Sequence, residues 1–202
     1  MTPLPKKEFR AILADPPWHF DTWSIKGRDR SPDSKHYPTM STREIVAINA
    51  RQCAADDCAL FLWATWPMLN HALYVMRAWG FEYKTCAFAW MKTNPNPYFD
   101  GLFKLSQGTG YWTRANTEVC LLGTKGNPKR RRADVAQAIL EPRREHSRKP
   151  DCIYKRIEAL VPGPYLELFA RQRRNGWTSW GNEVDKFGGQ DGKVKRLLPR
   201  RS

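Results

Sequence analysis

The sequence has 202 residues, of which 41% are hydrophobic and 12% aromatic, so it is long enough to form one domain with a substantial core. Lys and Arg number 34 against 20 Asp and Glu, and the resulting net charge of +14 predicts a polyanionic partner such as nucleic acid. A basic surface without a partner is the alternative interpretation. No apolar run is long enough to span a bilayer, and residues 1–9 are too polar for a signal peptide, so we expect no membrane association.

The five cysteines lack the paired spacing of zinc ligands. Cys58, Cys86 and Cys120 lie within apolar runs, where free cysteine behaves as a small hydrophobic residue. We therefore expect a reduced, intracellular protein that has no metal site.

The first predicted element is a strand at residues 9–14. It ends at Asp15-Pro16-Pro17-Trp18, because two successive prolines cannot continue the hydrogen-bond ladder of a strand. Ser41-Thr42-Arg43-Glu44 has the capping-box pattern, which predicts a helix that begins there and runs to about residue 50.

Strands and helices then alternate along the chain. The continuous apolar run at 58–65 is typical of a strand that is buried on both faces. Pro67 suits the first turn of the helix that follows, and Gly80 suits its end. Strands are predicted at 58–65, 83–92, 118–123 and 165–170, helices at 67–79 and 150–161, and loops at 94–110 and 125–132.

This alternation predicts an α/β fold with a mostly parallel central sheet and helices on both faces. We expect a single domain at 1–185 and a basic, flexible tail at 186–202. In such sheets ligands bind at the carboxyl ends of the strands. Asp15 and Arg171 each follow a predicted strand, and they would be neighbours if those two strands pair in parallel.

The tetrapeptide at 15–18 combines groups that suit chemistry on an aromatic amine. The Asp15 carboxylate and the Pro16 carbonyl are hydrogen-bond acceptors, and the restricted proline backbone presets their positions. Trp18 offers a face on which a base taken out of its helical stack can lie. The same four residues are also compatible with a simple tight loop after a strand.

Further motifs follow in order along the chain. They are LADPPW at 13–18, FLWAT at 61–65, WMKTN at 90–94, CLLGTKGNP at 120–128, HSRKPD at 146–151, and ELFAR with WTSWGNE between 167 and 183. In this set and this order the sequence resembles the MT-A family of N6-adenine methyltransferases. The resemblance spans about residues 9–185 and implies a Rossmann-like methyltransferase fold in a permuted order, with the catalytic motif first and the cofactor strand late. It also implies methyl transfer from S-adenosylmethionine to the N6 amine of adenine.

The resemblance implies roles for the residues around the target base. Asp15 would bind the target amine, while Pro16, Pro17 and Trp18 would shape the base pocket. Tyr37 would close over the base, although ordinary packing at a helix entrance also explains this tyrosine.

The resemblance also implies a set of residues that bind the cofactor. Lys149 would lie near the cofactor carboxylate and Arg171 near the ribose. The sequence departs from the family pattern at two places. Glu183 stands in place of Gln, and Arg173-Arg174 stands in place of a His-Asn pair. The second departure puts the cofactor contact of this segment in doubt. Only a short segment precedes Asp15, so another loop must contact the cofactor adenine. The expected cofactor-binding residues are Ala14, Asp15, Lys149, Phe169, Arg171, Arg173, Asn182 and Glu183.

Nucleic-acid contacts are expected from basic segments, since phosphate contacts position a protein without reading sequence. The alternative is that these side chains only keep the loops soluble. Glu118 matches a family glutamate beside the target pocket. The expected nucleic-acid-binding residues are Lys26, Arg28, Arg30, Glu118, Lys129, Arg130, Arg131, Arg132, Arg143, Arg144 and Arg148.

The substrate is expected to be DNA, because short members of the family that stand alone are bacterial or phage-like and many of them methylate DNA. RNA is the alternative substrate. Two further alternatives concern the function: a non-catalytic nucleic-acid-binding module and an N4-cytosine methyltransferase. We expect a cytoplasmic protein of a bacterium or of a phage-infected cell. It would act as a monomer or homodimer, and the sequence leaves a partner subunit open.

Overall fold

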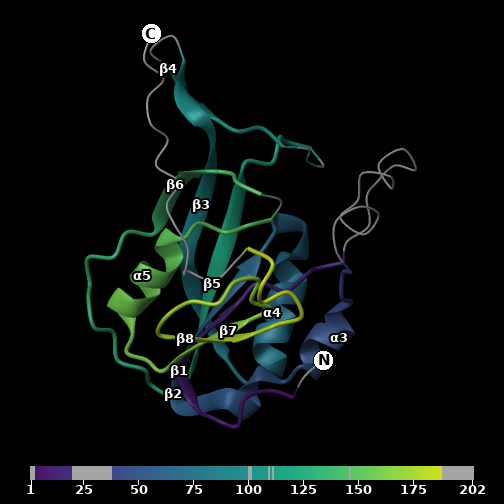
Figure 1. The fold of residues 1–202 in the computed structure, drawn as a ribbon, viewed down its shortest axis with the longest axis vertical. Coiled ribbons are helices and arrows are strands. Elements are labelled where there is room, and N and C mark those ends of the chain that lie inside the picture. Colours follow the sequence, from purple (N-terminus) through teal and green to yellow (C-terminus); the bar gives the residue numbers. More distant parts are fainter. Residues whose placement is uncertain are drawn as a thin grey trace.

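The computed structural model describes residues 3–19, 38–99, 102–108, 110, 112–145 and 147–187. Their strands form one eight-stranded sheet in the order β4-β3-β5-β2-β1-β7-β8, with β6 paired to β3 (Figure 1). The strands are β1 (Phe9–Ala14), β2 (Ala54–Ala64), β3 (Glu82–Phe99), β4 (Leu102–Leu105), β5 (Thr117–Lys125), β6 (Ala138–Pro142), β7 (Tyr165–Leu168) and β8 (Trp177–Trp180). The helices are α3 (Thr42–Ala47), α4 (Leu69–Ala78) and α5 (Cys152–Leu160), with 3₁₀ turns at Ala50–Cys53 and Trp66–Met68.

The sheet is mixed, so the expectation of a mostly parallel sheet is confirmed only in part. Strands β2, β1, β7 and β8 run parallel, and β6 runs parallel to β3. Strand β5 runs antiparallel to both β2 and β3, and β4 runs antiparallel to β3. The described residues between β3, β4 and β5 form no helix, and strands joined without a crossover connection pair in an antiparallel direction.

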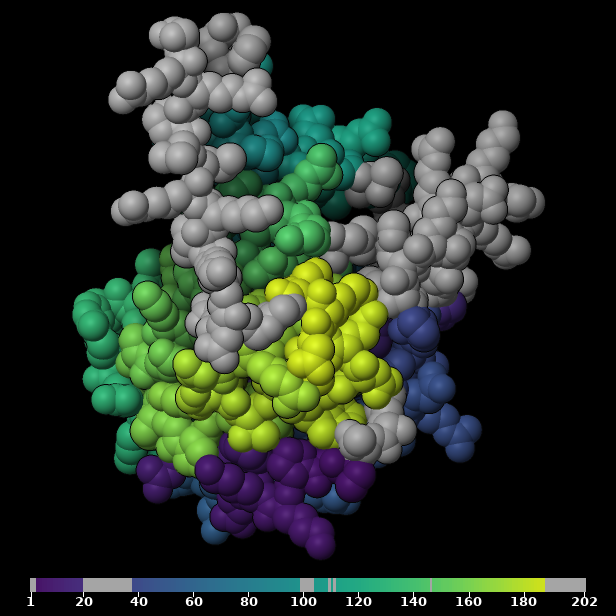
Figure 2. Space-filling view, viewed as in Figure 1, coloured from purple at the N-terminus to yellow at the C-terminus, as the bar shows by residue number. Residues whose placement is uncertain are grey.

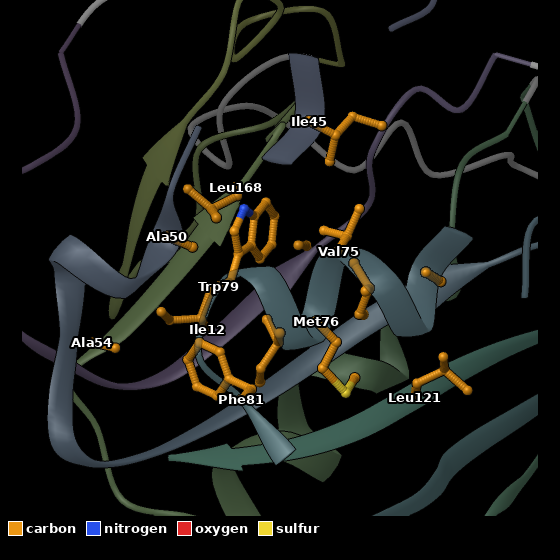
Figure 3. Packing of buried hydrophobic residues seen from close by; sticks show 14 of the residues in the cluster. Ile12, Ile45, Ala50, Ala54, Val75, Met76, Trp79, Phe81, Leu121 and Leu168 are labelled. Atoms are coloured by element: carbon orange, nitrogen blue, oxygen red, sulfur yellow. The ribbon is translucent and has the colours of Figure 1, made fainter. Parts of the chain in front are cut away.

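Helices cover both faces of the sheet, as expected. Successive side chains of a strand point to opposite faces, so neighbouring residues of β1 belong to different hydrophobic clusters. Ile12 lies in one cluster with Val75 and Met76 of α4 (Figure 3). Leu13 lies in the other cluster, with Ile153 and Ile157 of α5. Both clusters consist of fully or nearly fully buried side chains, so β1 forms the centre of the core.

Most predicted elements are confirmed with shifted ends. Ser41 caps α3, because its hydroxyl accepts from the Glu44 amide and its own amide donates to the Glu44 carboxylate. The predicted loop at 94–110 was wrong, since β3 continues to Phe99 and β4 pairs with it. The pairing register shifts between Thr93 and Tyr98, where the prolines lie, so the strand accommodates them in an irregular stretch.

The described carboxyl-terminal segment contacts the rest of the chain as far as Phe187. Phe187, assigned to the tail, donates its amide to the Arg171 carbonyl at 3.2 Å. Its ring lies 4.9 Å from the Arg148 guanidinium and 5.2 Å from that of Arg171. Residues 188–202 lie outside the described residues. Among the described residues, no helix has the length and apolar character needed to cross a membrane.

Candidate active site

The carboxyl ends of four parallel strands meet at one edge of the sheet. Asp15 follows β1, Thr65 follows β2, Phe169 follows β7 and Gly181 follows β8. Strands β1 and β7 pair directly, and the Arg171 guanidinium lies 3.8 Å from the Asp15 carboxylate. The expectation that Asp15 and Arg171 are neighbours is therefore confirmed.

The backbone after β1 is held in a tight turn. The Trp18 amide donates to the Pro16 carbonyl at 2.8 Å, and the Met40 amide donates to the Pro17 carbonyl at 2.8 Å. The Trp18 indole donates to the Trp63 carbonyl at 3.0 Å, and the side chain is only 7% exposed. Trp18 thus mainly fixes the loop in the core, and little of its ring is available to stack on a base.

A chain of charged side chains of alternating sign reaches Asp15 from within the sheet. The Lys149 ammonium lies 2.8 and 2.9 Å from the two Asp15 carboxylate oxygens and 3.3 Å from Glu118. Lys92 of β3 donates to the other oxygen of Glu118. Four groups from four segments therefore form one connected network beside β1.

The pKa shifts in this network favour its charged forms. Burial alone would lower the pKa of Lys149, but the charges of Asp15 and Glu118 outweigh it and raise the pKa well above its ordinary value. Burial would raise the pKa of Glu118, but Lys149 and Lys92 outweigh it and lower the pKa. Asp15 consequently faces a permanent cation.

The larger cavity at this edge has a volume of about 320 Å³. Phe169 has a left-handed backbone with φ of 61°, and its ring contacts Trp180 edge-on at 6.0 Å. A Cβ atom on Gly181 would lie 2.6 Å from the Ala170 carbonyl oxygen, so the backbone needs glycine there. The lining residues are Asp15, Pro16, Pro17, Pro38, Met40, Ser147, Phe169, Arg171, Trp180, Gly181, Asn182 and Glu183.

A smaller recess of about 40 Å³ lies on the other side of Asp15. Its walls are Asp15, Pro16, Trp18, Trp63, Ala64, Thr65, Glu118, Ser147 and Lys149. Asp15, Pro16 and Ser147 line both spaces. The predicted catalytic carboxylate thus lies where the larger cavity and the smaller recess meet.

A buried polar network supports the loop that carries Lys149. Tyr154 of α5 donates to the Glu167 carboxylate at 2.9 Å, and the Arg174 guanidinium lies 3.8 Å above the Tyr154 ring. Arg174 also donates to Asp151 at 2.8 Å, which ties the segment after β7 to the start of α5. Burial raises the pKa of Glu167 to about 7, against the opposing hydrogen bond from Tyr154.

The predicted cofactor-binding residues divide between several positions. Arg171, Asn182 and Glu183 line the larger cavity with Phe169 and Asp15. Lys149 lines the smaller recess instead, because its ammonium is held by Asp15 and Glu118. Ala14 is buried at the end of β1, and Arg173 is exposed and paired with Asp185 outside the cavity. Predicted residues that lie outside the described residues are Tyr37, Lys26, Arg28 and Arg30.

The predicted nucleic-acid-binding residues do not form one surface. Lys129 lies in a hollow with Arg10 and Asp56, at the amino ends of β1 and β2 and thus at the opposite end of these strands from Asp15. The neighbours Arg130, Arg131 and Arg132 belong to the same loop, and Arg132 pairs with Asp134. Arg144 and Arg148 lie near the site, where both pair with Asp151, and the Arg143 amide donates to the Thr93 carbonyl.

Several residues of the site were missed from the sequence. Lys92 and Trp63 lie in the WMKTN and FLWAT motifs, and Ser147 lies in HSRKPD. Lys92 comes directly after the apolar residues 86–91 of the predicted strand, which was a signal that it has a partner inside the protein. Met40 and Gly181 gave no such signal, because their contribution depends on how the loops pack.

Comparisons with known proteins identify the family. A profile of the MT-A70 family matches residues 9–183. Type II methyltransferase M.MunI of a Mycoplasma species is 35% identical over 198 residues, covering 90% of this chain and 80% of that protein. The MT-A70-like N(6)-adenosine-methyltransferase of Arabidopsis thaliana is 31% identical over 180 residues, covering 88% of this chain and 24% of that protein. The human N(6)-adenosine-methyltransferase catalytic subunit METTL3 is 31% identical over 182 residues, covering 88% of this chain and 28% of that protein. Since the profile covers nearly all of the described domain, this chain belongs to the MT-A70 family.

Proposed function

We propose that this protein transfers a methyl group from S-adenosylmethionine to the N6 amine of adenine in DNA. The observation that carries the proposal is the position of Asp15 where the larger cavity and the smaller recess meet. A methyl donor in the larger cavity and an amine in the recess would then meet beside one carboxylate. The N(6)-adenosine-methyltransferase relatives support this reaction.

The residues of the larger cavity fit S-adenosylmethionine. Phe169, Trp180 and Met40 provide aromatic and thioether surface for an adenine ring. Asn182 and Glu183 provide amide and carboxylate groups for ribose hydroxyls, and Arg171 a cation for the carboxylate of the methionine part. When bound, the cofactor supplies an electrophilic methyl group on a sulfonium centre.

Asp15 and Pro16 would prepare the amine for attack. The lone pair of the adenine amine is delocalised into the ring, so the amine is a weak nucleophile. A carboxylate and a carbonyl that accept its two hydrogens turn the lone pair toward the methyl carbon. When the amine takes the methyl group that the cofactor supplies, Asp15 would accept the proton that the nitrogen gives up. Lys149 keeps Asp15 in place through its two short contacts.

DNA is favoured over RNA by the extent of the matches. M.MunI is named a type II methyltransferase, the class that modifies DNA alongside restriction endonucleases, and this chain covers 80% of it. This chain spans about a quarter of the length of the adenosine methyltransferases of plants and animals that it matches. RNA is therefore the second candidate substrate.

Isotope transfer tests the proposal. The purified protein is incubated with S-adenosylmethionine carrying a deuterated methyl group and with DNA and RNA of matched sequence, and labelled nucleosides are quantified by mass spectrometry. We expect label in N6-methyldeoxyadenosine, and Asp15→Ala should reduce it by more than about a hundredfold because it removes the acceptor at the reacting nitrogen. Label in the ribonucleoside would identify RNA, and not DNA, as the substrate. If neither polymer is labelled and calorimetry detects no cofactor binding, the proposal that this protein is a methyltransferase is refuted.

A further inference from the structure

The proposed function needs a surface for DNA at the same end of the sheet as Asp15. The basic loop at 129–132 lies at the other end of the parallel strands, as Lys129 shows by its place beside Arg10. Arg144 and Arg148 lie near the site, but both are paired with Asp151. Other groups must therefore contribute to holding the strand beside the target adenine.

Strand β3 projects beyond the edge where the site lies. It pairs with β5 as far as Met91 and then continues to Phe99, where β4 turns back along it. At about 3.3 Å per residue this extension is roughly 25 Å long. Figure 1 shows β4 far from the start of β1, and Figure 2 shows this part of the chain, in teal, at one end of the molecule.

The base of the projection is fixed to the active-site network. The Ser106 amide donates to the Lys92 carbonyl at 2.7 Å, and the Lys92 amide donates to the Asn116 carbonyl at 2.8 Å. The Gly108 amide donates to the Ala115 carbonyl at 2.8 Å, which closes the loop between them. Since the Lys92 side chain bonds Glu118, the backbone of the loop and the charged network share one residue.

Exposed aromatic side chains mark this surface. Trp112 in the loop is 98% exposed, Tyr98 near the end of β3 is 70% exposed, and Trp66 is 53% exposed. The Trp66 indole donates to the Thr117 hydroxyl at 2.8 Å, next to the base of the loop, and Trp66 itself follows Thr65 of the smaller recess. Aromatic surface thus extends from the recess to the projection.

The charge of the projection is positive. From 92 to 117 the sequence contains three cationic residues, Lys92, Lys104 and Arg114, against one acidic residue, Asp100. Two acidic groups near the site are paired, Asp151 with Arg144 and Glu183 with Lys186. Exposed aromatic rings between cations are the combination that holds the bases and phosphates of a single strand.

We propose that this projection, comprising Tyr98, Lys104, Trp112 and Arg114, binds the DNA strand that carries the target adenine. The inference rests on the proposed function. An adenine that leaves its stack exposes the faces of its neighbours, and the Trp112 ring replaces the lost stacking. Arg114 and Lys104 contact the adjacent phosphates.

Binding of DNA to the full chain tests this role. The affinity for a fluorescein-labelled DNA duplex of mixed sequence, and for its separated strand, is measured by anisotropy over a series of salt concentrations. Trp112→Ala should raise the Kd for the strand about tenfold, as expected for the loss of a stacked base. Arg114→Ala should lower the slope of log affinity against log salt by about one.

Matched controls separate this role from general effects. Tyr74→Ala removes an exposed aromatic residue of α4, and Lys155→Ala removes a cation of α5; both should leave DNA affinity unchanged. Unchanged cofactor affinity by calorimetry verifies that the Trp112 and Arg114 variants are folded. If both variants bind DNA with wild-type affinity, this inference is wrong but the proposed function stands. The same conclusion follows if sedimentation shows a changed oligomeric state while DNA binding is unaltered. A wild-type protein that binds cofactor but no DNA would overturn the proposed function as well.

Discussion

Lys92 is the charged residue of the site that lies farthest from Asp15 along the chain of ion pairs. It contacts neither cavity at Asp15, and its partner Glu118 is nearly completely buried. A buried carboxylate is costly unless it is paired on both oxygens, and here Lys149 and Lys92 each occupy one. Lys92 is therefore a positioning residue, which holds Glu118 so that Glu118 can hold Lys149.

Lys92→Met tests this role through the dependence of stability on pH. In the wild type the pKa of Glu118 is lowered, so its contribution to stability is present above its ordinary pKa and is lost as the pH falls through the lowered value. Removing one of the two cations raises that pKa, so the variant should lose stability at a higher pH. At neutral pH we expect a loss of about 1–3 kcal/mol.

Thermal unfolding between acidic and neutral pH measures this difference. Lys84→Met, which removes the cation of an exposed pair with Glu82, should change the midpoint little at any pH. A Lys92 variant with the pH profile of the wild type would show that Glu118 does not depend on Lys92.

At the scale of elements, the sequence predicted what depends on local pattern. The apolar run of β2 and the capping box of α3 determine their elements from neighbouring residues alone. The short strands β4, β6 and β8 escaped prediction because each is too short to show a clear local pattern, and β6 in addition pairs with β3, far away in the sequence. That Asp15 and Arg171 are neighbours was predicted from topology, on the condition that β1 and β7 pair in parallel, and they do.

The residues of the site likewise divide into those that the sequence predicted and those whose position depends on distant contacts. Asp15, Lys149 and Arg171 stand in motifs and were predicted by resemblance to a family. Lys149 nevertheless lines the recess rather than the larger cavity, because the distances among Asp15, Glu118 and Lys149 decide which group it contacts. Such distances follow from the register of β1, β5 and the loop before α5, which no local pattern contains.

Gly181→Ala tests how the end of β8 shapes the larger cavity. The new methyl group would lie 2.6 Å from the Ala170 carbonyl oxygen and 2.7 Å from its amide nitrogen, so the backbone must move. Because Asn182 and Glu183 follow directly, we expect an affinity for S-adenosylhomocysteine about tenfold lower, measured by calorimetry. Gly176→Ala is the control: its methyl group meets no atom within 4 Å, although its φ of 80° is unfavourable for alanine. It should lower the unfolding midpoint and leave the affinity unchanged, and equal losses of affinity in both variants would contradict the prediction.

The whole sequence carries a net charge of +14, and described basic residues lie at both ends of the sheet. The field of such a protein attracts DNA from any direction, but only contacts at the carboxyl ends of the strands bring an adenine to Asp15. We therefore expect the basic loop at 129–132 to contribute to attraction at a distance, and the groups near the site to determine productive binding.

Salt should consequently affect the two substrates of the reaction very differently. Between about 50 and 200 mM salt, kcat/KM for DNA should fall by at least about tenfold, because each phosphate contact releases a counterion. The affinity for S-adenosylhomocysteine should change less than about twofold, because its contacts lie in a partly enclosed cavity where salt screens less. Initial rates with labelled cofactor and calorimetry over the same salt series measure both quantities. Parallel losses would mean that salt acts on the fold or on the cavity rather than on DNA binding, and the positive charge would then have no part in recognition.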